Sequence, residues 1–396
     1  MGGNVTAINK RSGEEVRAEK IPIKEIGRSN FTKKFVKVFA EVNKLYKKKY
    51  GEVLWKNEKN IANGLQFNGS TSYIFNGDIS DEEIVKYKTH AGDLDIIVPE
   101  DTKEQVWNLL DGLEGKEIIK GVEYIGSNKP TVSSIGEQIN SVFRVDFGNG
   151  KVVAAQVDFE FLPMADDNGT PSEWAKFSHS SSFDDAKVGV KAVHHKYLIQ
   201  SLVGGASIRD DVIIVTPTAT LDNWEKKQKK FKPGDLPRFL KFSVSRGIRT
   251  AYEPLFNEDG HQIVSGGKEV WREIPTKSST YTEIVKEIAN LSFGRDVDVS
   301  KFGSFVGVMS LMKEYLDKKQ LKATLDRYEE KLFAPYAQVL ERGEPKWDYE
   351  VKISGYKLFC KTFGFKENTK LIEKYYDNFP DSRNESMFRI ALGRIV

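Results

Sequence analysis

The 396-residue chain has few of the residues that form cross-links or bind soft metals. It contains one cysteine, Cys360, and five histidines, with no His-Glu-x-x-His pattern. A single cysteine forms no internal disulfide and no cysteine-based zinc or iron–sulfur site. The histidine spacing also argues against a zinc hydrolase. Because so little cysteine suits a reducing compartment, we expect a cytoplasmic protein.

Long apolar runs and a strong net charge are also missing. No apolar stretch approaches the roughly 18–20 residues that cross a bilayer, so we expect no membrane partner. Sixty Lys and Arg against 57 Asp and Glu give a formal net charge of +3, which argues against a histone-like binder and against an acidic tail. With 39% hydrophobic residues, the chain is able to bury a core of one large domain or two domains.

Hydrophobic residues spaced three and four apart predict several amphipathic helices. The first runs from Phe31 to Tyr50 and carries lysines on its polar side; a solvated face and a phosphate-binding face both fit them. The other predicted helices are 104–113, 186–203, 281–291, 302–333 and 352–378.

Short β-prone runs lie between these helices. Asp93–Val98 and Val152–Phe161 read as strands, and residues 240–275 read as a β-ribbon with a long turn at 257–260. The pattern predicts an α+β protein with a small mixed sheet, followed by the ribbon and a helical C-terminal domain. The expected segments are an N-terminal arm with a basic amphipathic helix (1–58), a domain of interleaved strands and helices (59–220), a basic segment with the ribbon (221–280) and a helical domain (281–396).

Two carboxylates lie two residues apart along the first predicted strand. In the run Gly92–Val98, Asp93 and Asp95 share one face and Leu94 and Ile96 the other. Adjacent carboxylates repel unless a positive charge lies between them, and Mg²⁺ prefers a few carboxylates together with water and phosphates. The pair therefore indicates a metal site, although an ordinary exposed strand face also fits it.

The second predicted strand repeats the pattern. Asp158 and Glu160 share one face, while Val157 and Phe159 share the other. Carboxylates on neighbouring strands hold two metals about 3.5–4 Å apart in enzymes that carry out displacement at phosphorus. Glu160 fits either a direct metal ligand or a group that orients a metal-bound water, and we favour the second role.

A small, hydroxyl-rich turn, Gly69-Ser70-Thr71-Ser72, precedes these strands. Backbone N–H groups in such a turn bind phosphate oxygens, although most turns of this composition are only turns. The chain contains neither a P-loop nor a Gly-x-Gly-x-x-Gly motif, so P-loop and dinucleotide enzymes are not indicated.

Gly69-Ser70, then Asp93-x-Asp95, then Asp158 together resemble the motifs of the polymerase-β-type nucleotidyltransferase superfamily over roughly residues 60–200. The resemblance implies that Asp93, Asp95 and Asp158 hold two Mg²⁺ ions, with Mn²⁺ as a substitute. It also implies that Gly69 and Ser70 hold the phosphates of an NTP. The segment between Ser70 and Asp93 is longer than the usual helix there, so we expect an insertion around 76–90.

A closer likeness is to nucleotidyltransferase-like proteins encoded by tailed bacteriophages. It is carried by four runs of sequence: Gly2-Gly3-Asn4-Val5, Gly69-Ser70-Thr71, Gly92-Asp93-Leu94-Asp95 and Gly189-Val190-Lys191-Ala192-Val193-His194. This resemblance implies expression in the cytoplasm of an infected bacterium.

Basic residues after the third carboxylate are candidates for binding the nucleotide. Lys187, Lys191 and either His194 or His195 fall three to four apart, on one face of the predicted helix 186–203. Lys191 and His194 would contact the NTP if that face meets the carboxylates, whereas a solvated basic face with a partly buried histidine is the alternative. The nearby Ser178, Ser180, Ser181 and Ser182 fit a phosphate site or a flexible loop.

The most basic window of the chain is 224–232, where lysines alternate with aromatic residues. Such a pattern suits a nucleic-acid backbone, and a solvated charge run is the alternative. The candidate acceptor-binding residues are Lys226, Lys227, Lys229 and Lys230, extended along the ribbon by Arg238, Lys241, Arg246 and Arg249.

These features predict an Mg²⁺-dependent nucleotidyltransferase that moves an NMP from an NTP to a hydroxyl, most simply at an RNA or tRNA 3′ end. Transfer to a protein or a small molecule is one alternative. A virion or partner-binding module that keeps the fold without turnover is another. The sequence indicates no oligomeric state.

Overall fold

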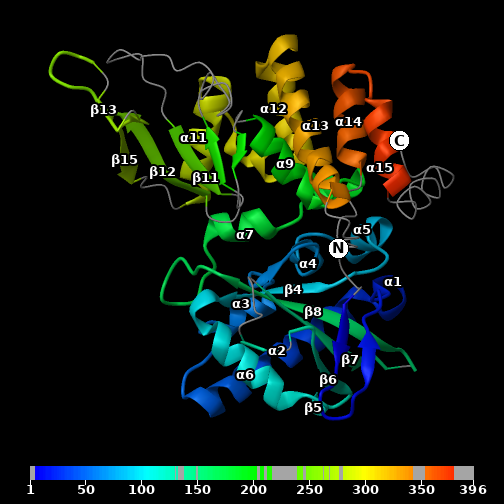
Figure 1. The fold of residues 1–396 in the computed structure, drawn as a ribbon. Helices are drawn as coiled ribbons and strands as arrows, with labels where there is room; N and C mark the ends of the chain where they lie inside the picture. The colour runs from blue at the N-terminus through cyan, green and yellow to red at the C-terminus, as the bar shows by residue number, and fades with distance from the viewer. Residues whose placement is uncertain are drawn as a thin grey trace. The chain divides into compact units, whose positions relative to one another are not determined.

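The computed structural model of the chain describes most of its residues. The described ranges are 5–129, 131–132, 138–148, 150–202, 206–208, 212–215, 239–243, 247–261, 263–266, 268–275, 280–341 and 353–378. The chain forms two compact units, residues 1–186 and 187–396 (Figure 1). Within the described ranges, no helix has the length and apolar character needed to span a membrane.

The first unit is built on a six-stranded mixed sheet, with strand order β3-β4-β8-β7-β6-β5. The strands are β3 (Phe67–Asn68), β4 (Leu94–Pro99), β5 (Lys116–Ile119), β6 (Val122–Ser127), β7 (Gln138–Asp146) and β8 (Val152–Leu162). Only the β4–β8 pair is parallel; the other neighbours in this sheet are antiparallel. A mixed α/β architecture with a mixed sheet is therefore confirmed, and both strands predicted around the carboxylates are present.

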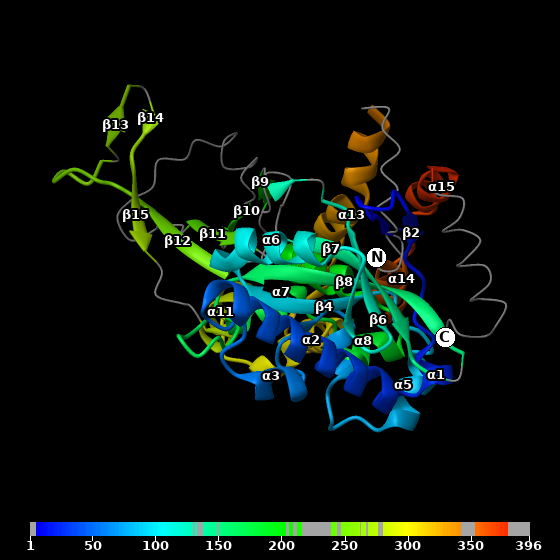
Figure 2. The same ribbon diagram turned by 90° about the horizontal axis from the view of Figure 1, so that it is seen from below.

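Two helices cover one face of this sheet (Figure 2). They are α2 (Arg28–Tyr50) and α6 (Lys103–Leu113), which confirm the helices predicted at 31–50 and 104–113. Phe39 of α2 packs against Phe67 and Phe159 of the sheet, at ring-centroid distances of 5.7 and 6.3 Å. Helix α2, which the sequence placed in a separate N-terminal segment, thus lies in the core of the first unit.

The prediction that residues 1–30 form an arm was wrong. Strands β1 (Thr6–Ile8) and β2 (Glu15–Arg17) form a hairpin, and a short helix, α1 (Ile23–Ile26), follows. Ala7 and Ala18 are buried with Ile125 and Val142 of the sheet. The strands are too short to show a hydrophobic period, so only their packing on the sheet reveals them.

The predicted insertion between the Gly69 turn and β4 is structured. The predicted insertion, around 76–90, contains α5 (Asp81–Tyr87); α4 (Thr71–Ile74) lies between Gly69 and the insertion, and α3 (Glu58–Ala62) precedes the turn. The buried Arg28 guanidinium donates to the carbonyl of Ile74 at 2.6 Å, to the carbonyls of Asn76 and Ile79, and to Asp81 at 2.9 Å. A single side chain from α2 therefore anchors the insertion.

The second unit contains a five-stranded sheet, ordered β15-β12-β11-β10-β9, whose neighbours are all antiparallel. Its strands are β9 (Ala206–Ile208), β10 (Val212–Val215), β11 (Phe239–Ser243), β12 (Gly247–Pro254) and β15 (Trp271–Pro275). A small hairpin of β13 (Val264–Ser265) and β14 (Lys268–Glu269) lies within the β12–β15 connection. The predicted ribbon is thus part of a wider sheet.

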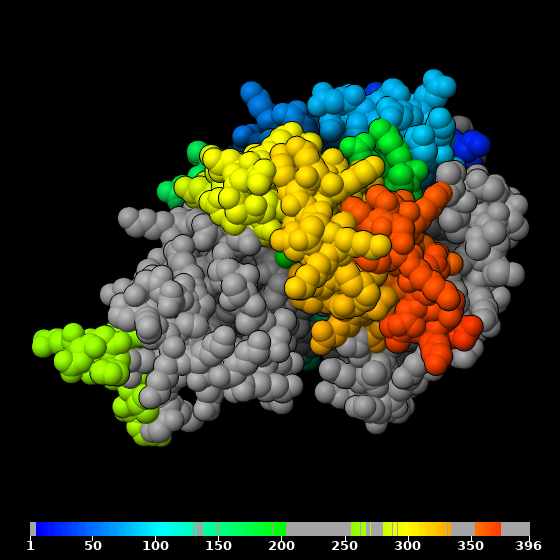
Figure 3. All heavy atoms as spheres, turned by 90° about the horizontal axis from the view of Figure 1, so that it is seen from above, coloured from blue at the N-terminus to red at the C-terminus, as the bar shows by residue number. Residues whose placement is uncertain are grey.

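Helices complete the second unit, and those after residue 280 form the yellow-to-red surface in Figure 3. They are α9 (Ala192–Leu202), α11 (Tyr281–Phe293), α12 (Phe305–Tyr315), α13 (Lys318–Glu341), α14 (Ser354–Phe363) and α15 (Thr369–Asn378), with a 3₁₀ turn, η3, at Val299–Gly303. The prediction that 302–333 and 352–378 each form one continuous helix was wrong. The first breaks at Leu316, which is extended (ψ 138°), and the second at Gly364 (φ +69°).

The predicted helix 186–203 was also wrong. Helix α7 (Glu173–His179) is followed by α8 (Phe183–Lys187), and α9 begins only at Ala192. Between α8 and α9, Gly189 has φ +73°, a left-handed conformation that ends a right-handed helix. Apolar periodicity continues across this break, which is why the pattern suggested one helix.

Candidate metal centre

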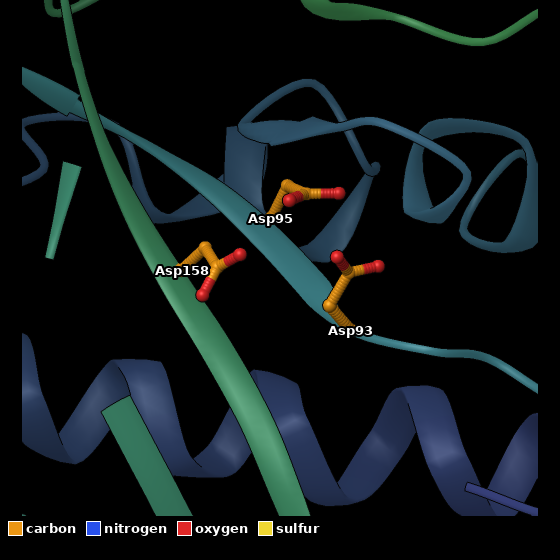
Figure 4. Close-up of side chains that lie close together, drawn as sticks. All are labelled: Asp93, Asp95 and Asp158. Atoms are coloured by element: carbon orange, nitrogen blue, oxygen red, sulfur yellow. The ribbon is translucent and has the colours of Figure 1, made fainter. Parts of the chain in front are cut away.

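Three aspartates from two neighbouring strands converge on the face of the first sheet that lies opposite α2 and α6. Asp95 of β4 is in register with Asp158 of β8, and Asp93 immediately precedes β4. One carboxylate oxygen from each of the three lies within 4.8 Å of the other two (Figure 4). The structure therefore brings together the three residues that the sequence singled out.

The alternation of each strand explains this placement. Leu94, Ile96, Val157 and Phe159 are fully buried in the core beneath α2. Since successive side chains of a strand point to opposite faces, the intervening Asp95 and Asp158 must lie on the other face. The parallel pairing of β4 with β8 then places these two carboxylates side by side.

Burial makes this cluster electrostatically costly. Asp95 is 8% exposed and Asp158 is 4% exposed. Desolvation, followed by the charges of Asp93, Glu160 and Asp158, raises the pKa of Asp95 well above its usual range. Desolvation and the charge of Asp93 raise the pKa of Asp158 to about 7. Both carboxyl groups therefore favour the protonated form unless a cation approaches them.

The protein supplies no such cation from its described residues. Within those ranges, no lysine, arginine or histidine forms an ion pair with Asp93, Asp95 or Asp158. Three convergent carboxylates that receive no ion pair from the described residues are a suitable ligand set for a hard divalent ion such as Mg²⁺, which accepts carboxylate oxygens and water. The cluster could therefore hold a metal ion.

Two amide side chains beside Asp158 were not predicted from the sequence. Gln156 Nε2 donates to both carboxylate oxygens of Asp158, at 3.0 and 2.9 Å. Asn140 lies opposite Asp158 in the β7–β8 register, and its side-chain hydrogen bond lowers the Asp158 pKa, as that of Gln156 does. Gln156 was detectable, because it precedes Asp158 by two residues and shares its face. Asn140 was not detectable, because its place beside Asp158 depends on the pairing of β7 with β8.

The Gly69 turn lies against the carboxylates. Gly69 has φ +55°, and a Cβ atom at this position would lie 1.8 Å from Asp95 Oδ2. The backbone N–H of Asp95 donates to Thr71 Oγ1 at 3.3 Å, and this hydroxyl donates to the Asp93 carbonyl at 3.5 Å. Ser70 is partly exposed at the start of α4. The turn therefore packs directly against the carboxylates that could hold a metal ion.

A segment distant in sequence holds this turn. The Gly69 N–H donates to the His179 carbonyl at 3.2 Å, and the Ser181 N–H donates to the Gly69 carbonyl at 3.1 Å. Ser180 Oγ donates to Asn68 Oδ1 at 3.1 Å. The serine-rich segment that the sequence left open as a phosphate site or a flexible loop is thus paired with the turn.

Glu160 lies outside the group of three aspartates. It accepts a hydrogen bond from Asn68 Nδ2 at 2.8 Å, and its Oε1 lies 3.7 Å from His179 Nδ1. Its partners come from the strand before the turn and from the segment that pairs with the turn. This arrangement favours a supporting role for Glu160 over direct metal binding.

The other predicted nucleotide contacts belong to the second unit. Because the helix is broken at Gly189, the prediction that Lys187, Lys191 and His194 share one helical face was wrong. His194 is fully buried, its Nδ1 lies 2.8 Å from Tyr328 Oη, and burial lowers its pKa to about 3. These contacts favour a packing role over nucleotide binding. Lys191 precedes α9 and is partly exposed.

The predicted acceptor-binding lysines lie outside the described residues, namely Lys226, Lys227, Lys229 and Lys230, together with Arg238 and Arg246. Lys241 lies on β11 and Arg249 on β12, and their side chains are also outside the described part.

Searches with the chain found no matching protein-family model, no matching curated protein and no matching solved structure.

Proposed function

We propose that the chain is an Mg²⁺-dependent nucleotidyltransferase whose core is the six-stranded sheet of the first unit. The observation that carries the proposal is the convergence of Asp93, Asp95 and Asp158 beside a turn that only glycine fits. Carboxylates of this kind next to a glycine turn suit displacement at phosphorus. The superfamily resemblance of the sequence agrees with this chemistry.

In the proposed reaction, an acceptor hydroxyl attacks the α-phosphorus of an NTP. The new O–P bond forms as the bond to the β-phosphate oxygen breaks, so that pyrophosphate leaves and the hydroxyl loses its proton. Magnesium would supply charge neutralisation for the phosphates and would lower the pKa of the attacking hydroxyl. Asp93, Asp95 and Asp158 would hold it.

The remaining residues of the site would position the reactants. Gln156 donates two hydrogen bonds to the Asp158 carboxylate and so holds it in place, and this carboxylate would accept the proton of the acceptor hydroxyl. The Ser70 hydroxyl would bind the β- and γ-phosphates, and Gly69, whose N–H already donates to the His179 carbonyl, would contribute by leaving room beside the carboxylates. An RNA 3′ end is the acceptor that we propose, on the basis of the basic window at 224–232.

Label transfer tests the reaction class directly. Purified protein, Mg²⁺ and bulk RNA would be incubated separately with each of the four NTPs, labelled either at the α- or at the γ-phosphate. A nucleotidyltransferase incorporates the α label and leaves the γ label in pyrophosphate, whereas a phosphotransferase does the reverse. Absence of α-label incorporation into RNA, protein or small molecules with every NTP, with either Mg²⁺ or Mn²⁺, would contradict the proposal.

Variants locate the reaction at the cluster. Asp93→Asn and Asp95→Asn should each abolish transfer while the fold is retained, because each removes a ligand and relieves repulsion. Asp158→Ala should be inactive, whereas Glu160→Ala should only be weakened, because Glu160 accepts a hydrogen bond from Asn68 and lies outside the group of three aspartates. Full activity in Asp93→Asn or Asp95→Asn would refute the assignment.

A further inference from the structure

A shallow hollow of about 740 Å³ lies over α2, away from the aspartates. The residues that line it are Lys34, Lys37, Ala40, Glu41, Asn43, Lys44 and Lys47 of α2, with Val53, Glu58, Ile119 and Lys120. Five lysines and two glutamates give its rim an excess of positive charge. We call this surface the α2 hollow.

The lysines of α2 lie together at a cost to the helix. Lys34 and Lys37 are three residues apart, as are Lys44 and Lys47, and like charges at this spacing destabilise a helix. The opposite side of α2 supplies the buried core residues Phe35, Phe39 and Val42. Core packing therefore requires α2 to turn a polar face outward, but it does not require that this face be basic.

The acidic residues of the hollow are already engaged. Glu41 pairs with Lys44 at 3.3 Å, and Glu58 accepts a hydrogen bond from Asn43 at 3.2 Å. Among the described residues, Lys37, Lys47 and Lys120 form no ion pair. Three ammonium groups from two separate parts of the chain thus remain available around one concave surface.

We propose that the α2 hollow binds the phosphate backbone of a single-stranded nucleic acid. Lys37 and Lys47 are ten residues apart on α2, about 15 Å along the axis at 1.5 Å per residue, a span that covers several phosphates. No aromatic side chain is among its lining residues in the described part of the chain, so bases find no stacking platform there. Binding should therefore be independent of sequence and sensitive to salt.

This surface is independent of the proposed reaction. Helix α2 packs on the sheet face opposite the aspartates, so occupation of the hollow requires neither a metal nor an NTP. The binding experiment is accordingly done in EDTA without nucleotide, and its result stands whether or not the chain transfers a nucleotide.

A matched pair of variants of the full chain tests the proposal. Lys37→Gln with Lys47→Gln removes two charges inside the hollow, and Lys33→Gln with Lys48→Gln removes two exposed charges of the same helix outside it. Glutamine has a helix propensity close to that of lysine, so both double variants should fold like the wild type, and circular dichroism would check this. The probe is a fluorescently labelled 20-nucleotide single-stranded RNA, followed by anisotropy from 50 to 300 mM KCl.

The hollow variant should bind the RNA about 10- to 100-fold more weakly at 50 mM salt, and its log–log salt slope should be shallower by about 1.4, or 0.7 for each lost contact. The control variant should keep a slope close to that of the wild type. Equal losses in both variants would indicate only the general field of the helix and would overturn the proposal. RNA binding by the Lys37→Gln/Lys47→Gln variant that equals that of the wild type would also overturn the proposal. The same holds if Lys37 and Lys47 prove to bind phosphatidylserine vesicles but not RNA.

Discussion

Asp95 and Asp158 are carboxylates that folding removes from water while leaving them beside each other and beside Asp93. Their raised pKa values mean that the folded chain binds protons more tightly than the unfolded chain does. The stability that these protons contribute is complete below a pH of about 4 and is lost as the pH rises through the folded-state pKa, about 7 for Asp158.

We therefore expect the unfolding free energy of the metal-free protein to fall between pH 5 and pH 8, and that of Asp158→Asn to fall by a smaller amount. The difference should be on the order of 2–4 kcal/mol. Urea unfolding in EDTA at the two pH values measures it. The buried His194 has the opposite trend, because its lowered pKa makes stability fall as the pH drops from 6.5 towards 3, but it contributes equally to both proteins. Identical pH profiles for the two proteins would contradict the electrostatic account.

Gly69 gives a second prediction at the residue scale. Gly69→Ala should destabilise the chain and weaken divalent-metal binding, because its Cβ would displace the Asp95 carboxylate. Gly51→Ala is the control: Gly51 also has a positive φ, +84°, but nothing lies within 4 Å of its Cβ. The control variant should lose about 1 kcal/mol of unfolding free energy and keep its metal affinity. Titration with Mn²⁺ and urea unfolding of both variants would measure the two effects, and equal metal affinities would refute the contact.

At the scale of elements, a buried side chain of α2 connects the core helix to the insertion that leads to the three aspartates. Arg28 donates to three carbonyl groups of residues 74–79 and pairs with Asp81. The insertion therefore depends on α2, and through α2 on the hydrophobic core, for its conformation.

Arg28→Met should leave these carbonyls without their donor. Buried acceptors that lose a partner cost about 1–3 kcal/mol, so we expect a loss of about 3 kcal/mol in unfolding free energy. Limited proteolysis should also show earlier cleavage between residues 74 and 81. Arg17→Met, which changes an exposed arginine of β2, should alter neither quantity. Equal resistance to proteolysis in both variants would show that other contacts hold the insertion.

At the scale of the whole molecule, the first unit has its own core and contains all three aspartates that could hold a metal ion. The cluster of buried residues that includes Phe35, Phe39 and Phe159 extends from Ile21 to Phe183, entirely within residues 1–186. Asp93, Asp95 and Asp158 belong to the same unit.

A fragment of residues 1–186 should therefore fold cooperatively and bind Mn²⁺ as tightly as the full chain, within about threefold. Calorimetric titration of the fragment, the full chain and a fragment carrying Asp95→Asn would measure this. The Asp95→Asn fragment should lose most of the binding. An unfolded wild-type fragment would show that the second unit is needed for the first to fold.

The alternation of apolar and polar residues was sufficient to predict β4 and β8, and the spacing of Phe35, Val38, Phe39 and Val42 to predict α2. In both cases the buried side of the element repeats with the period of its own backbone, so local sequence carries the signal. The same alternation placed Asp95 and Asp158 on the faces away from the core.

Other features depend on segments that are far apart in the sequence. The pairing of β4 with β8 brings Asp95 to Asp158, β7 brings Asn140, and the segment after α7 holds the Gly69 turn. The breaks at Leu316, Gly364 and Gly189 were not predicted, because apolar periodicity continues across a change in backbone direction. The sequence by itself determined which residues are carboxylates and which face of a strand they occupy. Only the tertiary structure decided which carboxylates meet, because strand order and register arise from packing of the whole sheet.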